Sequence, residues 1–474
     1  MTALDSGDLT ATELLARYGT GELDPVIVAE ESLGELSTYG LELNAVIARA
    51  DQDTVRAAAM ESRERWRHGV PRPLEGVPVG VKDIVATCDL PTTGGSAVLG
   101  SSVPRVDATC VRRLREAGAI IVAKLATSEF AAGQPDNLTF GKVRNPWDHD
   151  RWTGGSSTGS GAALAARLVP LAIGTDTGGS IRIPSAWCGT TGLKPTYGRV
   201  PRTGVLTLSW TLDHVGPMTR SARDCGAMLN IMAGADGVDP TASSQVVDQP
   251  GGSVSKGDLR GVRIGAVGGW FTDICDSDVV SAWRDALDVL VDSGATVHEV
   301  ELRSADIAFA AGWQILFAEA ASLHEGHLER LDDLDPGFAA RMLQGRFVLA
   351  VDYLRALRLR TVVIDEALDV LDRVDVLCMI GVPGTAPLFS DLLVDIDGEA
   401  MPMQSVHSRA TMFANFTGLP AMMLPSGYGR AGMPLALQLI GRPFAESVLV
   451  EVGAALQDRT DHHQRRPLRV ASRQ

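Results

Sequence analysis

Two glycine-serine clusters about a third of the way along the chain have the composition of a catalytic site. One is Gly-Gly-Ser-Ser at residues 154–157, and the other is Gly-Gly-Ser at residues 178–180. Between them, residues 162–167 favour a helix and residues 168–173 form an apolar run of strand length. Glycine-rich turns at the ends of buried elements can direct backbone N–H groups at one ligand, in a phosphate site or an oxyanion hole. No lysine follows either cluster, which disfavours the phosphate interpretation.

A nucleophilic serine needs a base, and the sequence around residue 180 is not the Gly-x-Ser-x-Gly elbow of lipases. Lysine is the other available base. Lys82 ends residues 74–82, an apolar run of strand character. Burial at that position would favour the neutral amine, which can act as a base near neutral pH. The alternative is a structural ion pair with Asp83.

Three segments taken together resemble the amidase signature family of serine hydrolases. They are residues 77–83 (Val-Pro-Val-Gly-Val-Lys-Asp), residues 154–157, and residues 174–184 (Gly-Thr-Asp-Thr-Gly-Gly-Ser-Ile-Arg-Ile-Pro). The order and spacing match, and the resemblance extends over most of the chain. It implies an α/β fold in which a mixed, twisted central β-sheet is covered by α-helices on both faces.

The resemblance also implies a Ser-Ser-Lys triad. In this interpretation Ser180 is the nucleophile, and Ser156, which follows a cis peptide bond in relatives, relays its proton to Lys82. The oxyanion hole is expected from the backbone N–H groups of Thr177, Gly178, Gly179 and Ser180. Supporting contacts around these loops are expected from Ser157, Asp176 and Arg182. We expect no cofactor and no metal.

The substrate pocket is harder to assign. Glu129 and Gln134 follow a predicted strand, in a stretch that the family places along the substrate cleft. Trp210, Trp313 and Phe317 are further candidates, although each aromatic side chain could instead pack in the core. His324 and His327 have the wrong spacing for the helical His-Glu-x-x-His zinc pattern, and we expect them on a solvated helix face.

The predicted organisation is one integrated domain with four parts. They are an N-terminal helical region (1–70), the signature core (71–235), a variable α/β and helical region that forms part of the pocket (258–373), and a C-terminal part of the core (374–468).

Composition limits the expected partners and compartments. The 474 residues are 45% hydrophobic, and 58 acidic against 43 basic residues give a net charge of −15. Nucleic acids and anionic membranes reward basic surfaces, so we expect neither as a partner. The expected partner is a small amide-like substrate, with a second copy in a homodimer as a further option. Six cysteines without close paired spacing and no recognisable signal peptide predict a cytoplasmic location.

The predicted activity is hydrolysis of a C–N bond in a small carboxamide or related acyl-nitrogen compound, such as an aryl amide, anilide or hydrazide, through an acyl-enzyme on Ser180. One alternative is the glutaminase subunit of a tRNA-dependent amidotransferase. Residues 401–415 contain no acid for the α-amino group of glutamine, which disfavours that alternative. Another is a non-catalytic binding or scaffold subunit, which the complete set of Lys82, Ser156 and Ser180 disfavours.

Overall fold

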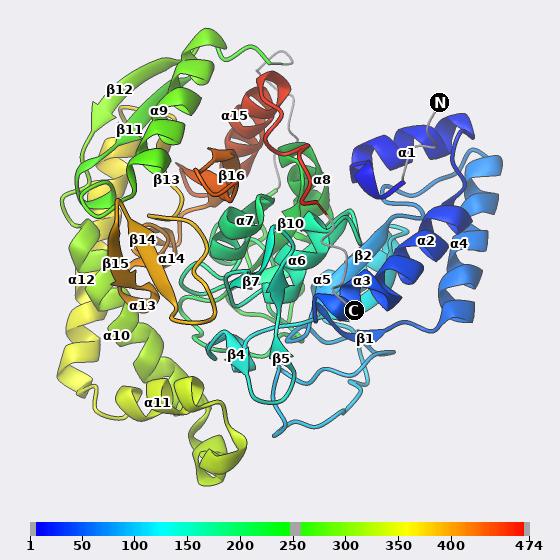
Figure 1. Cartoon of the computed structure of the whole chain (residues 1–474), viewed down its shortest axis with the longest axis horizontal. Coiled ribbons are helices and arrows are strands. Elements are labelled where there is room, and N and C mark those ends of the chain that lie inside the picture. The colour runs from blue at the N-terminus through cyan, green and yellow to red at the C-terminus, as the bar shows by residue number, and fades with distance from the viewer. Residues whose placement is uncertain (1–5, 247–256, 469–474) are drawn as a thin grey trace.

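An eleven-stranded mixed β-sheet forms the centre of the molecule (Figure 1). The computed structural model describes residues 6–246 and 257–468. The strand order is β1-β3-β2-β8-β10-β9-β16-β17-β13-β11-β12. The strands are β1 (Val46–Arg49), β2 (Pro78–Lys82), β3 (Ile120–Leu125), β8 (Leu171–Asp176), β9 (Thr191–Lys194), β10 (His214–Thr219), β11 (Arg263–Val267), β12 (Thr296–Val300), β13 (Val376–Ile380), β16 (Ala421–Tyr428) and β17 (Pro434–Gly441).

Helices cover this sheet, and short two-stranded hairpins lie outside it. The α-helices are α1 (Ala11–Thr20), α2 (Pro25–Ser37), α3 (Tyr39–Glu42), α4 (Gln52–Arg67), α5 (Thr109–Glu116), α6 (Thr158–Ala165), α7 (Arg182–Cys188), α8 (Ala222–Met232), α9 (Ser277–Asp292), α10 (Ala305–Leu323), α11 (Pro336–Gly345), α12 (Ala350–Leu371), α13 (Met403–Val406), α14 (Met412–Thr417) and α15 (Glu446–Arg459). The hairpins are β4 (Asp136–Asn137) with β5 (Gly141–Lys142), β6 (Arg144–Asn145) with β7 (Asp148–Trp152), and β14 (Leu393–Ile396) with β15 (Glu399–Pro402). The predicted mixed α/β fold is confirmed.

The sheet topology brings distant segments of the sequence to one edge. Strand β2 runs parallel to both β3 and β8, with Val81 opposite Ile173. The carboxyl ends of parallel strands lie at the same edge of a sheet. Lys82, the last residue of β2, therefore lies beside the glycine-serine loop that begins where β8 ends at Asp176.

The N-terminal region agrees only in part with the sequence analysis. Helix α1 begins with a capping box between Thr10 and Glu13, and Pro25 occupies the first turn of α2. Residues 46–49, however, form the edge strand β1, which pairs antiparallel with β3. The region that we predicted to be helical thus also contains a strand, which the sequence did not reveal because four residues are too few to show a strand period.

The C-terminal half follows the predicted pattern more closely. Strands β11 and β12 run parallel and are joined by α9, so a βαβ unit opens the region that we predicted to be α/β and helical. Helices α10, α11 and α12 then form the outer layer at the left of Figure 1. A single apolar cluster of buried side chains extends from β2 through the sheet to α10 and α12. The boundaries that we placed at residues 70, 235 and 373 remain predictions.

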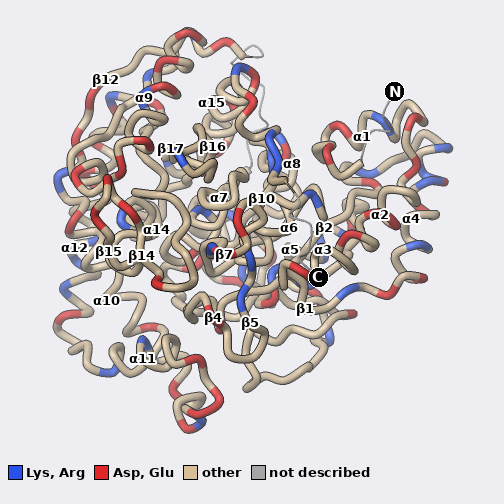
Figure 2. Tube along the Cα trace, in the orientation of Figure 1, with Lys and Arg blue, Asp and Glu red and all other residues tan. Residues whose placement is uncertain are grey.

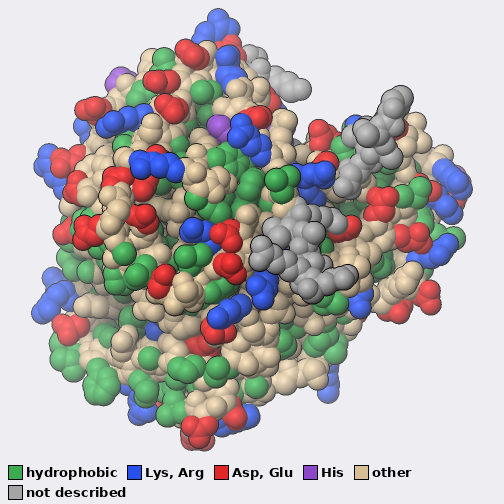
Figure 3. Space-filling view, viewed as in Figure 1, with side chains coloured by type: hydrophobic (Ala, Val, Ile, Leu, Met, Phe, Trp, Pro, Cys, Tyr) green, Lys and Arg blue, Asp and Glu red, His purple; other side chains and the backbone are tan. Residues whose placement is uncertain are grey.

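Charged side chains lie mainly on the outer elements of the fold. Figure 2 shows acidic and basic residues along α4, α9 and α12, with fewer in the central strands. On the face seen in Figure 3 the two signs are interspersed.

All six cysteines are free thiols, and five of them are buried. Among residues 6–246 and 257–468, no helix combines the length and apolar character needed to cross a bilayer.

Candidate active site

Lys82 lies in the position of a catalytic base. Its side chain is fully buried, and its Nζ lies 2.8 Å from Ser156 Oγ and 2.8 Å from Thr175 Oγ1. Burial lowers the pKa of Lys82 from 10.5 to about 7, against the opposing effect of the nearby charges of Asp176 and Asp213. At neutral pH a substantial fraction of this amine is unprotonated and can take a proton from Ser156.

The two serine clusters lie side by side in the fold. The Gly155–Ser156 peptide bond is cis, and the backbone N–H of Ser157 donates to the carbonyl oxygen of Ser180 at 3.2 Å. The Ser157 hydroxyl lies 3.3 Å from the carbonyl oxygen of Thr175, which ties the start of α6 to β8. Ser156 and Ser180 line the same narrow pocket. The arrangement thus combines the partly exposed Ser180 hydroxyl, the Ser156 hydroxyl and the buried Lys82 amine.

Asp176 and Arg182 hold the loop that carries Ser180. Both are completely buried, and Arg182 contacts Asp176 through Nε (3.0 Å to Oδ2) and Nη2 (2.9 Å to Oδ1). Burial alone would raise the pKa of Asp176, but the Arg182 charge and hydrogen bonds hold it well below its usual value. A buried ion pair is tolerated when its remaining polar groups also have partners. The other Arg182 donors bond to oxygens of Thr411, Asn415 and Gln438.

The predicted oxyanion hole needs one correction. The N–H of Gly179 donates to Asp176 Oδ1 at 2.8 Å and is therefore committed to the loop itself. Within the described residues, the N–H groups of Gly178 and Ser180 donate to no protein acceptor. The fold still requires a glycine at position 179, because its φ is +130° and an added Cβ would lie 2.3 Å from Thr411 Oγ1. Thr177 is fixed by a 2.6 Å hydrogen bond from its hydroxyl to Asp213.

The pocket beside Ser180 is small and mostly apolar, with a volume of about 50 Å³. Apolar side chains from several elements, among them α7, α10 and α13, form most of its walls. Side chains that line it include Trp152, Ile183, Leu208, Trp313, Leu316 and Met403, together with Gln134, Arg341 and His407.

The comparison with known proteins identifies the family. The family model for amidases matches residues 28–450. The chain belongs to the amidase signature family. It is therefore a hydrolase of C–N bonds other than peptide bonds.

Two sequence relatives of this amidase carry the same name. The chain is 37% identical to a glutamyl-tRNA(Gln) amidotransferase subunit of Roseiflexus sp. (strain RS-1), over 97% of this chain and 98% of the relative. It is 39% identical to the protein of the same name from Halorhodospira halophila (strain DSM 244 / SL1), again over 97% and 98%.

Similar solved structures include proteins with other names. A protein of "an unexpected vestigial protein complex", connected with the origins of an s-triazine catabolic enzyme, matches with a TM-score of 0.90, 33% identity, and coverage of 95% of this chain and 98% of that chain. The peptide amidase from Stenotrophomonas maltophilia matches with a TM-score of 0.85, 28% identity, and coverage of 98% and 99%.

These relatives contradict the expected partners of the amidase. We predicted that it has no nucleic-acid partner and forms at most a homodimer. The curated relatives are named as one subunit of an enzyme that acts on a tRNA, and a structural neighbour belongs to a protein complex. Our prediction was wrong because net charge describes one chain, whereas the nucleic-acid surface of an assembly can belong to another subunit.

Three of the predicted pocket residues of the amidase do not line the pocket. Glu129 is buried and its carboxylate accepts a 2.5 Å hydrogen bond from the backbone N–H of Asp335. Phe317 packs against Trp313, with 5.1 Å between ring centroids. Trp210 is 40% exposed, outside the pocket. Trp313 alone of these aromatic candidates reaches the pocket.

Sequence analysis missed Arg341 and His407. Arg341 lies on α11 in a chain with many exposed arginines, and His407 lies in residues 401–415, which stood out only for their lack of acids. Gln134, which we did predict, lines the pocket and accepts a 3.2 Å hydrogen bond from Gln404.

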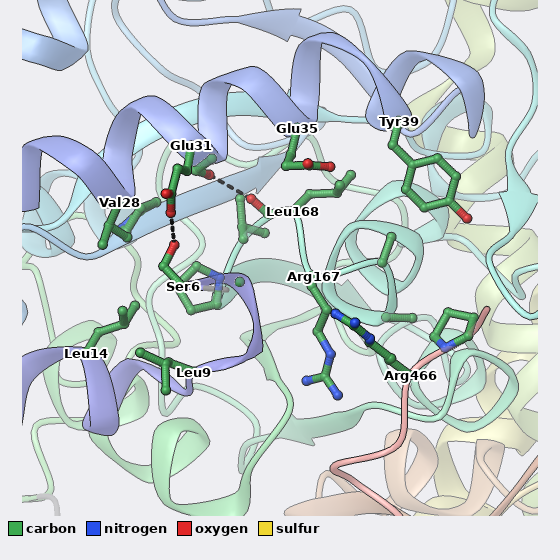
Figure 4. A pocket seen from close by; sticks show the side chains of 18 of the residues that line it. Ser6, Leu9, Leu14, Val28, Glu31, Glu35, Tyr39, Arg167, Leu168 and Arg466 are labelled. Atoms are coloured by element: carbon green, nitrogen blue, oxygen red, sulfur yellow. Dashed lines mark hydrogen bonds between the residues drawn. The ribbon is translucent and has the colours of Figure 1, made fainter. Parts of the chain in front are cut away.

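A roomier cavity of about 390 Å³ lies away from this site (Figure 4). Glu31 and Glu35 of α2 face Arg167 and Arg466 across it, and the Ser6 hydroxyl donates to Glu31. Among the described residues, no lysine lines this cavity. Because a serine-lysine pair is missing there, we assign the chemistry to the narrower pocket.

The histidine pair was also misplaced by the sequence analysis. His324 is buried, not solvated, and its ring lies 4.8 Å from that of Phe130, which also stacks on His327 at 4.8 Å. Burial lowers the pKa of His324 to about 4. The pair thus contributes to packing under the loop that follows β3.

Proposed function

We propose that Lys82, Ser156 and Ser180 form the catalytic triad and that the chain is the amide-hydrolysing subunit of an assembly similar to the amidotransferase relatives. The observation that carries the chemical part is the 2.8 Å contact between the Lys82 amine and the Ser156 hydroxyl, deep beside the pocket that Ser180 lines. A base whose pKa is about 7 is matched to proton transfer at neutral pH.

In this mechanism the Ser180 hydroxyl oxygen attacks the carbonyl carbon of the amide. The Ser180 proton passes to Ser156, and the Ser156 proton passes to neutral Lys82. The N–H groups of Gly178 and Ser180, with that of Thr177, stabilise the negative oxygen of the tetrahedral intermediate. The proton then returns through Ser156 to the departing nitrogen, which leaves as ammonia or an amine.

Water completes the reaction by attacking the acyl-enzyme carbonyl. It gives one proton along the same relay, the ester bond to Ser180 breaks, and Ser180 recovers its proton as the carboxylic acid is released. Asp176 and Arg182 touch neither reacting atom, and their role is to hold the Ser180 loop. Ser157 acts in the same way on the Ser156 loop.

The subunit interpretation rests on the relatives. Those from Roseiflexus and Halorhodospira are each named as a glutamyl-tRNA(Gln) amidotransferase subunit, and each is covered over nearly its whole length. By that similarity the hydrolysed amide supplies ammonia to a second active site on a partner protein, and the tRNA is bound by the assembly. This was the alternative in our sequence analysis.

A second candidate function is hydrolysis of an amide other than glutamine, without transfer of the released ammonia to a partner protein. It is favoured by one observation: among the described residues, no aspartate or glutamate lines the pocket, so an α-ammonium group would find no counter-charge there. Structural neighbours of this kind include the peptide amidase of Stenotrophomonas maltophilia.

Ammonia release separates the two candidates. The purified chain is assayed with glutamine, aliphatic amides, aryl amides and acyl hydrazides, both by itself and with the partner proteins of an amidotransferase. Release from glutamine that requires the partners supports the subunit function, whereas release from another amide by the isolated chain supports the second candidate. Ser180→Ala is the control in both cases, and ammonia release by that variant would contradict the triad.

A further inference from the structure

Asp213 lies just before strand β10, next to the loop that carries Ser180. Strands β8 and β10 pair antiparallel, with Asp176 opposite His214. This register places Asp213, the residue before His214, beside Thr177, the residue after Asp176. The sheet thus brings an acid to the start of the loop that forms the proposed oxyanion hole.

The Asp213 carboxylate joins two segments that line the pocket. Its Oδ1 accepts a hydrogen bond from the Thr177 hydroxyl at 2.6 Å. Its Oδ2 accepts the backbone N–H groups of Leu208 at 2.8 Å and of Ser209 at 3.1 Å. Thr177 and Leu208 both line the pocket beside Ser180. One carboxylate is therefore a shared acceptor for the oxyanion loop and for the pocket wall.

Side-chain packing does not join these two segments completely. A space of about 10 Å³ lies between them, and Thr175, Thr177, Leu208 and Asp213 are among the residues that line it. Atoms that face a gap lose part of their van der Waals attraction. The three hydrogen bonds to Asp213 therefore provide much of the connection between the loop and the wall.

A second carboxylate holds the outer part of the wall segment. Glu319 of α10 accepts hydrogen bonds from the Ser209 hydroxyl at 2.5 Å, from the Thr211 N–H at 3.1 Å and from the Thr211 hydroxyl at 2.8 Å. These contacts attach the wall segment to α10. Removal of the Asp213 carboxylate should therefore release the link to Thr177 and leave the wall segment attached to α10.

Asp213 also places a negative charge close to the base. Burial raises the pKa of Asp213 to about 6, so its carboxylate is mostly ionised above that pH. The charge favours the protonated form of Lys82, against the larger effect of burial on that amine. The other charged or titratable groups around this pair are Asp176, Arg182, Lys194, Arg202, His214 and Glu319. A substitution of Asp213 leaves all of these groups in place.

We propose that Asp213 is a positioning residue for amide hydrolysis, because its carboxylate holds the oxyanion loop and the pocket wall in one arrangement. It acts through Thr177 and Leu208 and not on the reacting atoms. The inference rests on the proposed function in taking Ser180 as the nucleophile. A displacement of about 1 Å in a site can lower a rate about 100-fold, so the arrangement of loop and wall matters for the reaction.

The rate at which a fluorophosphonate labels Ser180 tests the proposal. Asp213→Ala removes all three acceptor contacts and should label about 10- to 100-fold more slowly than the unmodified chain at pH 9. Asp213→Asn keeps the shape, since its oxygen can accept the two backbone N–H groups while its nitrogen donates to the Thr177 hydroxyl. Asp213→Asn should therefore label within about threefold of the unmodified rate at pH 9.

The pH dependence separates this role from a general loss of stability. In the unmodified chain the labelling rate should rise about tenfold between pH 6 and pH 8, because the pKa of Lys82 is about 7. Asp213→Asn removes an anion that favours protonated Lys82, so the pKa of Lys82 should fall. The rise between pH 6 and pH 8 should therefore be smaller in Asp213→Asn.

Asp224→Asn is the matched control. Asp224 is buried and accepts the backbone N–H groups of Ala11 and Thr12 and the Thr12 hydroxyl, which are the same kinds of donor that Asp213 has. Asp224→Asn should keep the labelling rate and its pH dependence. If Asp213→Ala does not fold, Thr177→Val removes the same link from the other side and should slow labelling about tenfold.

Hydrogen exchange follows the two segments without any chemistry at Ser180. Amides of residues 175–180 and 206–212 should exchange faster in Asp213→Ala than in Asp213→Asn or Asp224→Asn. Unchanged exchange, or labelling of Asp213→Ala at the unmodified rate, would overturn the proposal. An unchanged rise between pH 6 and pH 8 in Asp213→Asn would contradict the influence of Asp213 on the base. Faster exchange in Asp213→Ala, in a chain whose Ser180 is not labelled, would contradict the proposed function and leave the anchoring of both segments standing.

Discussion

The rate at which a fluorophosphonate labels Ser180 should rise about tenfold between pH 6 and pH 8. Labelling requires the Ser180 proton to move through Ser156 to neutral Lys82, so its rate follows the unprotonated fraction of Lys82. With a pKa of about 7, that fraction is about one tenth at pH 6 and about nine tenths at pH 8. The activity is therefore present above pH 7 and is lost as the pH falls.

The assay needs no knowledge of the natural substrate. Second-order labelling rates are measured by intact-protein mass spectrometry at intervals from pH 5 to pH 10, with spontaneous probe hydrolysis followed in parallel. Lys82→Ala is the control. It should label about 100- to 10,000-fold more slowly, the usual contribution of a general base, and should lose the inflection near pH 7.

Two results would refute the reasoning. A rate that still climbs steeply between pH 9 and pH 10 would mean that Lys82 keeps a pKa near the 10.5 of a solvated lysine, so that burial has not made it a base. An inflection near pH 7 that persists in Lys82→Ala would assign the titration to another group, of which Asp213 is the first candidate because burial raises its pKa to about 6.

Three other predictions concern the groups that support the site. Thr175→Val removes the second 2.8 Å partner of Lys82 Nζ and should slow labelling about tenfold with little change in melting temperature; unchanged labelling would contradict a role for that contact. Arg182→Met leaves Asp176 buried and unpaired and should cost about 3–5 kcal/mol in urea unfolding, partly restored by adding Asp176→Asn. Thr10→Ala removes the α1 capping box and should cost about 1 kcal/mol in the same assay with normal labelling; a labelling defect would link α1 to the site.

The centre of the site could be predicted because its parts lie next to regular elements with clear patterns. Lys82 ends an apolar strand, and both serine clusters lie in glycine-rich loops beside buried elements. Parallel pairing of β2 with β8 then brings these loops together. Local pattern indicates only the strands and the glycine-rich loops; the roles of the three residues come from the resemblance to the family, and the fold adds the register.

The pocket wall could not be predicted in the same way. It is built from side chains on α10, α11 and the segment around His407, whose approach depends on how helices pack and leaves no mark in the local sequence. Glu129 and Phe317 lie within a few residues of true pocket residues but point into neighbouring contacts with Asp335 and Trp313. Arg341 is distinguished from other arginines only by its surroundings in the folded chain.

Peptide mapping of the fluorophosphonate adduct tests the central claim most directly. Trypsin is expected to release residues 168–182, in which Ser180 is the only serine, separately from residues 152–167, which contain Ser156. The account predicts that the adduct lies on peptide 168–182 and is absent from the Ser180→Ala variant. An adduct on peptide 152–167, or one that persists in Ser180→Ala, would contradict the assignment of Ser180 as the nucleophile.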